Sequence, residues 1–221
     1  MKIYPLLKTF CFASLLLIFT SCISQKIFKE KNGFLRVEAE DFYLQTNNSV
    51  RKWYVVDKNF TTDLKDADFS HSKSASKNKY VEILPDTRQT HADKLIRKEN
   101  FSNVPGIAVL HYKVNIKNPG RYYVWVKAFS TGSEDNGIHV GLNGKWPNSG
   151  KRMQWCKGKR SWYWESKQRT KEVHCGIENA IYLDIEKAGE HTIQFSMRED
   201  GFEMDEWLIT SDKNYNPRNI K

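Results

Sequence analysis

The amino-acid sequence predicts an all-β domain, built as a sandwich or as a barrel. Apolar and polar residues alternate with a period of two in one segment after another, and turn-forming residues separate these segments. In residues 109–116, for example, Leu110 and Tyr112 fall on one face of the strand while His111 and Lys113 fall on the other. No stretch of ten or more residues carries an apolar stripe of helical spacing, so helices are not expected to build the core.

The predicted strands follow one another along a single domain, residues 34–212, with a C-terminal tail at 213–221. They are a first strand around 37–42 and later strands at 80–84, 109–116, 121–129, 138–142, 181–185, 191–197 and about 203–210. Gly, Pro and Asn at 118–120, 143–144 and 187–189 are typical of the turns between them. Two long polar stretches, about 57–78 and 145–170, interrupt the pattern, and loops of that length usually carry function or are disordered.

The charge balance is basic, with 35 Lys and Arg against 26 Asp and Glu in 221 residues, a formal net charge of +9. Such a balance indicates either an anionic partner or a well-solvated surface. The basic residues are spread along the chain, with no basic helix and no zinc-finger or RNA-binding motif, so no nucleic-acid partner is expected. An acidic polysaccharide fits the charge.

The N-terminal residues 1–21 have the pattern of a signal peptide. Lys2 and Lys8 precede an uncharged apolar run at 10–19, which ends in small residues immediately before Cys22. This ending resembles the bacterial lipobox and predicts that the lipid is attached at Cys22. The alternative is an ordinary secretory signal cleaved near the same point. The expected location is the bacterial cell envelope, with a lipid anchor in the outer membrane on its periplasmic or surface side.

Residues 22–33 are then expected to be a polar tether. Of four cysteines, one lies inside the signal and one is the acylation candidate, which leaves Cys156 and Cys175. In an oxidising compartment these two are expected to form a disulfide, worth roughly 3 kcal/mol for a loop of about twenty residues. The alternatives are two free thiols or a metal site, but His and Cys partners at zinc spacing are missing from the sequence around them.

Four motifs, taken in order, resemble a known family. They are VEAEDF at 37–42, PGRYYVWV at 119–126, AGEHTI at 188–193 and GFEMDEW at 201–207. The order resembles the galactose-binding-like domains of carbohydrate-binding module families 6 and 35, and still more the related C-terminal domain of family 115 glycoside hydrolases. The resemblance covers about 34–212. It implies a jelly-roll β-sandwich of two antiparallel sheets, whose first and last strands lie together and which binds carbohydrate.

The resemblance also implies a structural Ca²⁺ site. Its ligands would be Glu38 and Glu40 of the opening motif and Asp205 of the closing motif. Calcium prefers several carboxylate oxygens, and residues two apart on a strand point the same way. The alternative is that these carboxylates pair with Lys or Arg at the edge of the sandwich.

Aromatic residues mark a candidate sugar-binding stretch. Four of the seven tryptophans fall close together, at Trp146, Trp155, Trp162 and Trp164. Sugars stack their C–H faces on flat rings and need polar groups for their hydroxyls, which Asp135, Asn136 and Arg169 could supply. The alternative is that some of these rings belong to the core.

A second polar cluster follows the strand at 80–84. Arg88 and His91 lie there beside two aspartates in residues 86–94. They could contact an anionic sugar or hold a long loop together through internal hydrogen bonds.

The sequence favours non-catalytic binding of a polysaccharide over catalysis. No spacing selects a pair of carboxylates for a glycosidase, and no Gly-x-Ser-x-Gly or His-Glu-x-x-His motif is present. The alternatives are a polysaccharide lyase or hydrolase, and a surface domain that binds another protein. Because the chain leaves no room for a catalytic domain, a binder is expected to act alone or together with glycan-degrading enzymes encoded elsewhere.

Overall fold

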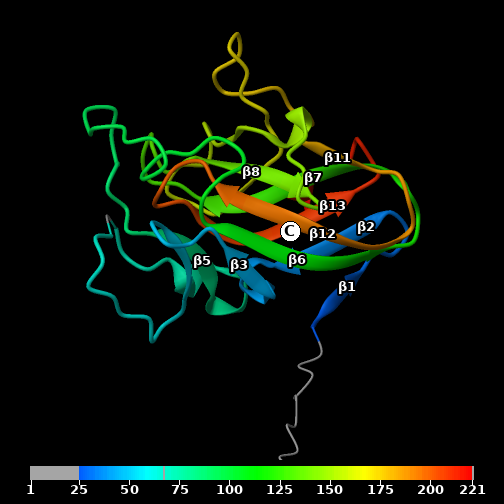
Figure 1. Cartoon of the computed structure of the whole chain (residues 1–221), viewed down its shortest axis with the longest axis horizontal. Coiled ribbons are helices and arrows are strands. Elements are labelled where there is room, and N and C mark those ends of the chain that lie inside the picture. The colour runs from blue at the N-terminus through cyan, green and yellow to red at the C-terminus, as the bar shows by residue number, and fades with distance from the viewer. Residues whose placement is uncertain (1–24, 67, 221) are drawn as a thin grey trace, which may run out of the picture.

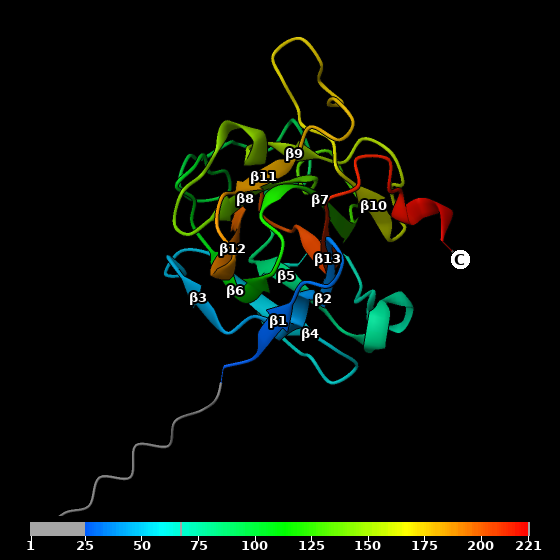
Figure 2. The same ribbon diagram turned by 90° about the vertical axis from the view of Figure 1, so that its right-hand side faces the viewer.

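A computed structural model describes residues 25–66 and 68–220. The predicted signal peptide and the lipidation site at Cys22 lie outside these residues. The described chain forms two facing β-sheets, seen as two layers in Figures 1 and 2. The prediction of a two-sheet sandwich is confirmed, and the barrel alternative is not.

The first sheet has the order β1-β6-β12-β8-β9, with β3 also paired to β6. Its strands are β1 (Ile27–Lys29), β3 (Leu44–Thr46), β6 (Val109–Ile116), β8 (Gly137–Leu142), β9 (Met153–Gln154) and β12 (Gly189–Met197). All pairs in this sheet are antiparallel except β1 with β6, which is parallel.

The second sheet has the order β10-β7-β13-β5-β4, with β11 also on β7 and β2 also on β13. Its strands are β2 (Phe34–Glu38), β4 (Lys52–Val56), β5 (Tyr80–Leu84), β7 (Gly120–Phe129), β10 (Tyr163–Glu165), β11 (Tyr182–Ile185) and β13 (Glu203–Thr210). All its pairs are antiparallel. The pairing of β2 with β13 places the first strand of the predicted domain beside the last, as the resemblance implied.

Helical structure in the described residues is limited to short 3₁₀ turns. These are η1 (Ala39–Asp41), η2 (Ser72–Ser74), η3 (Ser76–Asn78), η4 (Asn148–Gly150) and η5 (Pro217–Asn219). None of the helices in the described part of the chain has the length and hydrophobicity needed to span a membrane.

The main core lies between the two sheets and is built around aromatic rings. The ring of Trp207 from the second sheet meets Tyr112 and Phe195 from the first, with centroids 5.0 and 5.4 Å apart. All three side chains are fully buried. A buried aromatic side chain removes about 150–250 Å² from water, so each of these rings contributes several kcal/mol to folding.

The expected tether at 22–33 is wrong in its described part. Residues 27–29 form β1, and the carboxylate of Glu30 accepts hydrogen bonds from the backbone N–H groups of Lys117 and Asn118, at 2.8 and 3.1 Å. Glu30 is buried. Its charge tolerates this because three or more hydrogen bonds to the carboxylate replace those that it would make with water. This segment is therefore part of the sandwich.

Candidate functional site: a basic aromatic groove

A second aromatic cluster lies on the outer face of the second sheet. Trp125 of β7 and Leu208 of β13 are cross-strand partners, and both pack against Trp164 of β10 outside the main core. Phe34 and Tyr215 pack against this cluster, and their ring centroids are 5.2 Å apart. The C-terminal segment therefore covers the sheet, and η5 lies beside β10 (Figure 2).

A groove of about 480 Å³ runs along this cluster, and we call it the basic groove. Its lining residues are Arg36, Lys127, Trp162, Tyr163, Trp164, Tyr215, Pro217, Arg218 and Ile220. Four of the nine carry aromatic rings and three carry positive charges, while none is Asp, Glu or His.

Arginine side chains lie over the aromatic rings of the basic groove. The guanidinium of Arg36 is 5.3 Å from the ring centroid of Trp164, and that of Arg218 is 5.6 Å from Tyr163. Arg218 also donates a hydrogen bond of 3.1 Å to the hydroxyl of Tyr163. Cation–π contacts of this kind contribute about 0.5–1 kcal/mol at exposed sites, so they hold cations and rings in one arrangement.

Buried carboxylates lie beneath these cations. Glu206 accepts two hydrogen bonds from Arg36, at 2.6 and 2.7 Å, and this pairing raises the pKa of Arg36. The ammonium of Lys127 is 2.8 Å from Asp205 and 3.4 Å from Glu206. Glu206 and Asp205 are buried, whereas the side chain of Arg36 is 46% exposed, so positive charge faces solvent at the groove.

Trp162 is the half-buried ring at one end of the basic groove. Its indole N–H donates to the Ser74 hydroxyl at 3.2 Å, and its ring meets Tyr80 and Phe129 edge-on at 5.3 and 5.5 Å. These contacts fix the ring before any ligand arrives, which lowers the entropy cost of binding.

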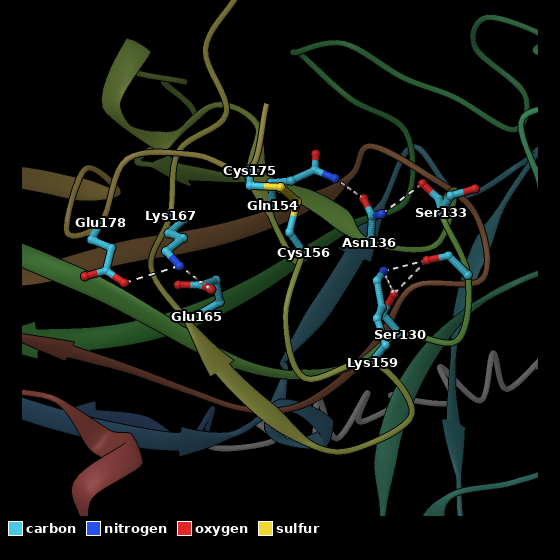
Figure 3. The surroundings of a disulfide bond; sticks show 11 residues. Ser130, Ser133, Asn136, Gln154, Cys156, Lys159, Glu165, Lys167, Cys175 and Glu178 are labelled. Atoms are coloured by element: carbon cyan, nitrogen blue, oxygen red, sulfur yellow. Dashed lines mark hydrogen bonds and ion pairs between the residues drawn. A yellow bond between two sulfur atoms is a disulfide. The ribbon is translucent and has the colours of Figure 1, made fainter. Parts of the chain in front are cut away.

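The disulfide between Cys156 and Cys175 is present, as predicted. Trp162 and Trp164 lie inside the loop that it closes. Around it, Lys167 pairs with Glu165 and Glu178, at 3.6 and 3.2 Å (Figure 3).

The same region supports the loop at residues 130–136. Lys159 donates to the Ser130 hydroxyl and to the carbonyl of Gly132, and the Gln154 amide contacts that of Asn136 (Figure 3). The disulfide-closed loop is thereby joined to a neighbouring loop as well as to the sheet.

The four predicted tryptophans have different environments. Trp162 and Trp164 line the basic groove, although Trp164 is only 8% exposed and forms part of its floor. Trp155 is a core residue, 1% exposed, with its ring 5.1 Å from Phe202, so its prediction as a sugar-stacking ring is wrong. Trp146 is half-buried, packs against Gly141 and does not line the groove.

The polar residues predicted for sugar binding lie away from the basic groove. Arg88 is buried, and both Arg88 and His91 contact the carboxylate of Glu134. These contacts hold the loop together, which was the alternative to binding of an anionic sugar. Arg169 is half-buried, and burial lowers the pKa of its guanidinium.

Asp135 and Asn136 are also occupied within their loop. Asp135 accepts hydrogen bonds from the Ser130 hydroxyl and from the backbone N–H of Thr131, both at 2.6 Å. The Asn136 side chain donates to the carbonyl of Ser133 at 2.8 Å. Both residues are buried, so their hydrogen bonds hold the loop.

Seven groove residues escaped the sequence analysis, namely Arg36, Lys127, Tyr163, Tyr215, Pro217, Arg218 and Ile220. A signal for two of them exists: Arg36 and Lys127 interrupt apolar strands at positions that face away from the main core. Such charged positions on an otherwise apolar strand indicate an outer face, but not which strands lie side by side there.

The predicted calcium ligands are only partly arranged as expected. Glu38 ends β2, but Glu40 lies in η1, so the two are not on one strand. Glu38 accepts from the Ser76 hydroxyl at 3.0 Å and lies 3.2 Å from the ammonium of Lys77.

Asp205 is likewise close to a cation, Lys127, and burial raises its pKa to about 6. The alternative, ion pairing with Lys or Arg, therefore holds for two of the three predicted calcium ligands, Glu38 and Asp205. However, Glu38 Oε2 and Glu40 Oε2 are buried and each lack a hydrogen-bond donor, which fits an oxygen-binding cation such as Ca²⁺.

Two other groups of acidic and histidine side chains could hold a metal ion. They are Asp68, His71 and Glu203, and Asp66, Asp68 and Glu82, whose ligand atoms all come within 4.8 Å of one another in each group. The ligand atoms of Glu38, Glu40 and Asp205 are not gathered this closely.

Comparison with known proteins gives one sequence relative and several similar structures. No family model matches the chain. The chain is 58% identical over 193 residues to the uncharacterized protein P23 of Formosa agariphila, a match that covers 86% of this chain. It spans 47% of that relative, about half its length.

Among solved structures, the chain resembles family 35 carbohydrate-binding modules. A module from Clostridium thermocellum matches with 13% identity and a TM-score of 0.44, over 81% of this chain and 98% of the module. A Podospora anserina mannanase of the GH26-CBM35 type matches with 14% identity and a TM-score of 0.46, over 85% of this chain and 29% of the mannanase.

Proposed function

We propose that the chain binds an anionic polysaccharide in the basic groove and does not cleave it. The observation that carries this proposal is the placement of Arg36, Lys127 and Arg218 among four aromatic rings. The rings suit the C–H faces of sugars, and the cations suit carboxylate or sulfate groups. The excess of Lys and Arg over Asp and Glu would attract such a polymer at long range.

The chemistry of the groove supports binding rather than hydrolysis. A glycosidase needs two carboxyl groups that flank the scissile bond. The lining residues of the basic groove include no carboxyl group, and Glu206 beneath them is engaged by Arg36 and Lys127. The same lining favours a glycan over a protein partner because it forms a groove with three cations among four rings rather than a flat aromatic patch.

The test is titration of the full chain with an anionic polysaccharide and with a neutral one of similar length. Binding to the anionic polymer alone, weakened by salt, is expected, and Arg218→Ala should weaken it about tenfold or more. Arg121→Ala is the matched control, because Arg121 also lies over a ring, that of Tyr182, but outside the groove. Equal loss in both variants, or no binding of either polymer, would refute the proposal.

Measurement of reducing ends during the same titration tests the enzyme alternatives. An unchanged polymer length is expected. Release of oligosaccharides would instead show a lyase or hydrolase. Binding to neither polymer, together with capture of one defined protein, would favour the protein-interaction alternative.

We further propose that the chain is exported and held in the cell envelope by a lipid on Cys22, where it works with glycan-degrading enzymes. The support is the order of charged, apolar and small residues that ends at Cys22. Mass spectrometry of the N-terminal peptide from a bacterial host should find acylated Cys22. A peptide that begins elsewhere, without lipid, would contradict this.

A further inference from the structure

A cluster of acidic side chains lies at the end of the second sheet, apart from the basic groove. Glu82 of β5 and Glu203 of β13 are directly paired across the two strands, and both are 2% exposed. Like charges directly opposite one another in a sheet are destabilising. Burial, with the neighbouring carboxylates, raises the pKa of both groups well above the ordinary value.

A loop brings three more side chains to this pair. His71 Nδ1 is 2.9 Å from both carboxylate oxygens of Glu203. A carboxylate oxygen of Asp68 lies within 4.8 Å of a ring nitrogen of His71 and of a carboxylate oxygen of Glu203. Asp68 also has a carboxylate oxygen within 4.8 Å of carboxylate oxygens of Asp66 and Glu82. The five residues, Asp66, Asp68, His71, Glu82 and Glu203, form what we call the acidic cluster.

The acidic cluster carries four carboxyl groups without a matching cation. Among the ion pairs of residues 25–66 and 68–220, none joins a lysine or an arginine to any of them. Buried carboxylates are normally paired or bound to a metal, because an unpaired buried charge costs several kcal/mol. The cluster is therefore short of positive charge.

An independent feature next to Asp68 points to a ligand beside the acidic cluster. Asp86 follows β5 and is 5% exposed, yet its Oδ1 atom has no hydrogen-bond donor. Asp86 and Asp68 line one hollow of about 600 Å³, so this hollow borders the acidic cluster at Asp68. A buried carboxylate oxygen without a partner beside such a hollow needs an explanation, and a bound cation supplies one.

We propose that the acidic cluster binds a divalent cation through Asp68, His71 and Glu203, with Asp66 and Glu82 close to the same ion. A site with one imidazole nitrogen and several carboxylate oxygens suits Zn²⁺ or Mn²⁺, whereas Ca²⁺ is bound by oxygen atoms alone. The ring of His71 is held for this role by stacking on Phe129, with centroids 3.6 Å apart. This site is separate from the basic groove and can be tested without any polysaccharide.

The experiment is calorimetric titration of the full chain, first treated with a chelator, with Zn²⁺ and with Mn²⁺. We expect stoichiometric binding of at least one of these ions, weakened on the order of tenfold or more by His71→Gln. Since the His71 side chain is 19% exposed and its ring is at the edge of the cluster, this variant should fold. Glu203→Gln is the second variant, read together with its thermal unfolding.

Glu38→Gln is the matched control, because it removes a carboxylate from the other acidic site. Binding that is lost in Glu38→Gln and kept in His71→Gln would overturn the proposal. So would the lack of stoichiometric binding of either ion by the unmodified chain.

Discussion

The imidazole of His71 stacks on the ring of Phe129, with centroids 3.6 Å apart and planes inclined by 18°. Trp162 meets the same phenyl ring edge-on at 5.5 Å. Phe129 therefore lies between the acidic cluster and the basic groove and contacts an important ring of each. A change at this one position should disturb both sites.

Phe129→Leu tests this link. Leucine keeps most of the buried volume, so the expected loss of stability is about 1 kcal/mol. However, His71 and Trp162 both lose the flat face that orients them, so metal and polysaccharide should each bind several-fold more weakly. Titrations with Zn²⁺ and with the anionic polysaccharide measure the two effects. An effect on only one ligand would show that Phe129 does not join the sites.

Two tryptophans should respond in opposite ways to replacement by alanine. Trp155→Ala should lower the free energy of unfolding by about 3–5 kcal/mol, because it opens a cavity in the main core. Trp162→Ala should change stability much less but weaken polysaccharide binding on the order of tenfold. Denaturant unfolding and titration of both variants check this. If Trp162→Ala destabilises as much as Trp155→Ala, Trp162 is a core residue.

The disulfide should contribute to both stability and binding. Cys156→Ser with Cys175→Ser is expected to cost about 2–4 kcal/mol, because the unfolded chain gains freedom. Binding should weaken as well, since Trp162 and Trp164 lie in the loop that is closed. Unfolding in denaturant and titration of this double variant measure the two losses. Unchanged binding would mean that β10 alone fixes the groove.

Asp86 should make stability depend on pH. Burial and the nearby Asp200 raise its pKa from 3.8 to about 7. The folded state then keeps a proton that the unfolded state releases, so stability should fall as pH rises from about 4 to 7 and level off above that.

Asp86→Asn removes that contribution, so the stability of the variant should fall less steeply with pH than that of the unmodified chain. Between pH 4 and pH 7 the two losses of unfolding free energy should differ on the order of a few kcal/mol. Denaturant unfolding between pH 4 and 8 in the presence of a chelator measures it. Glu82, Glu203 and Asp68 also have raised pKa values, so some of the fall should remain in the variant. Parallel curves for variant and unmodified chain would contradict the prediction.

Calcium should stabilise the chain through Glu38, Glu40 and Asp205. Ca²⁺ at about one hundred times its dissociation constant would add roughly 2.7 kcal/mol to the free energy of unfolding. Glu40→Gln should remove this gain, whereas His71→Gln should keep it because His71 belongs to the acidic cluster. Thermal unfolding with and without Ca²⁺ tests both variants. A gain that survives Glu40→Gln would place calcium elsewhere.

Local pattern was enough to predict the disulfide and the strands β5, β6, β7, β8, β11, β12 and β13, whereas β1, β3, β4, β9 and β10 were not predicted. Alternation in residues 109–116 and the turn before β7 depend on neighbours in the chain, so they can be recognised in the sequence. Two cysteines remained after the N-terminal pair was assigned, which left one pairing. The segment at 22–33 was misjudged because β1 is three residues long and is stabilised by β6, which lies far away in the sequence.

The sequence by itself determined that this protein is an all-β domain with a tryptophan-rich stretch at residues 146–164 and one disulfide. Only the tertiary structure decided which tryptophans are core residues: Trp155, directly after β9, packs on Phe202 in the main core, whereas Trp164 of β10 belongs to the second cluster. It also decided that Glu82 and Glu203, more than a hundred positions apart in the chain, are cross-strand partners beside His71. The physical reason is that periodicity fixes the face of a strand, whereas the pairing of distant strands and the packing between sheets fix what that face meets.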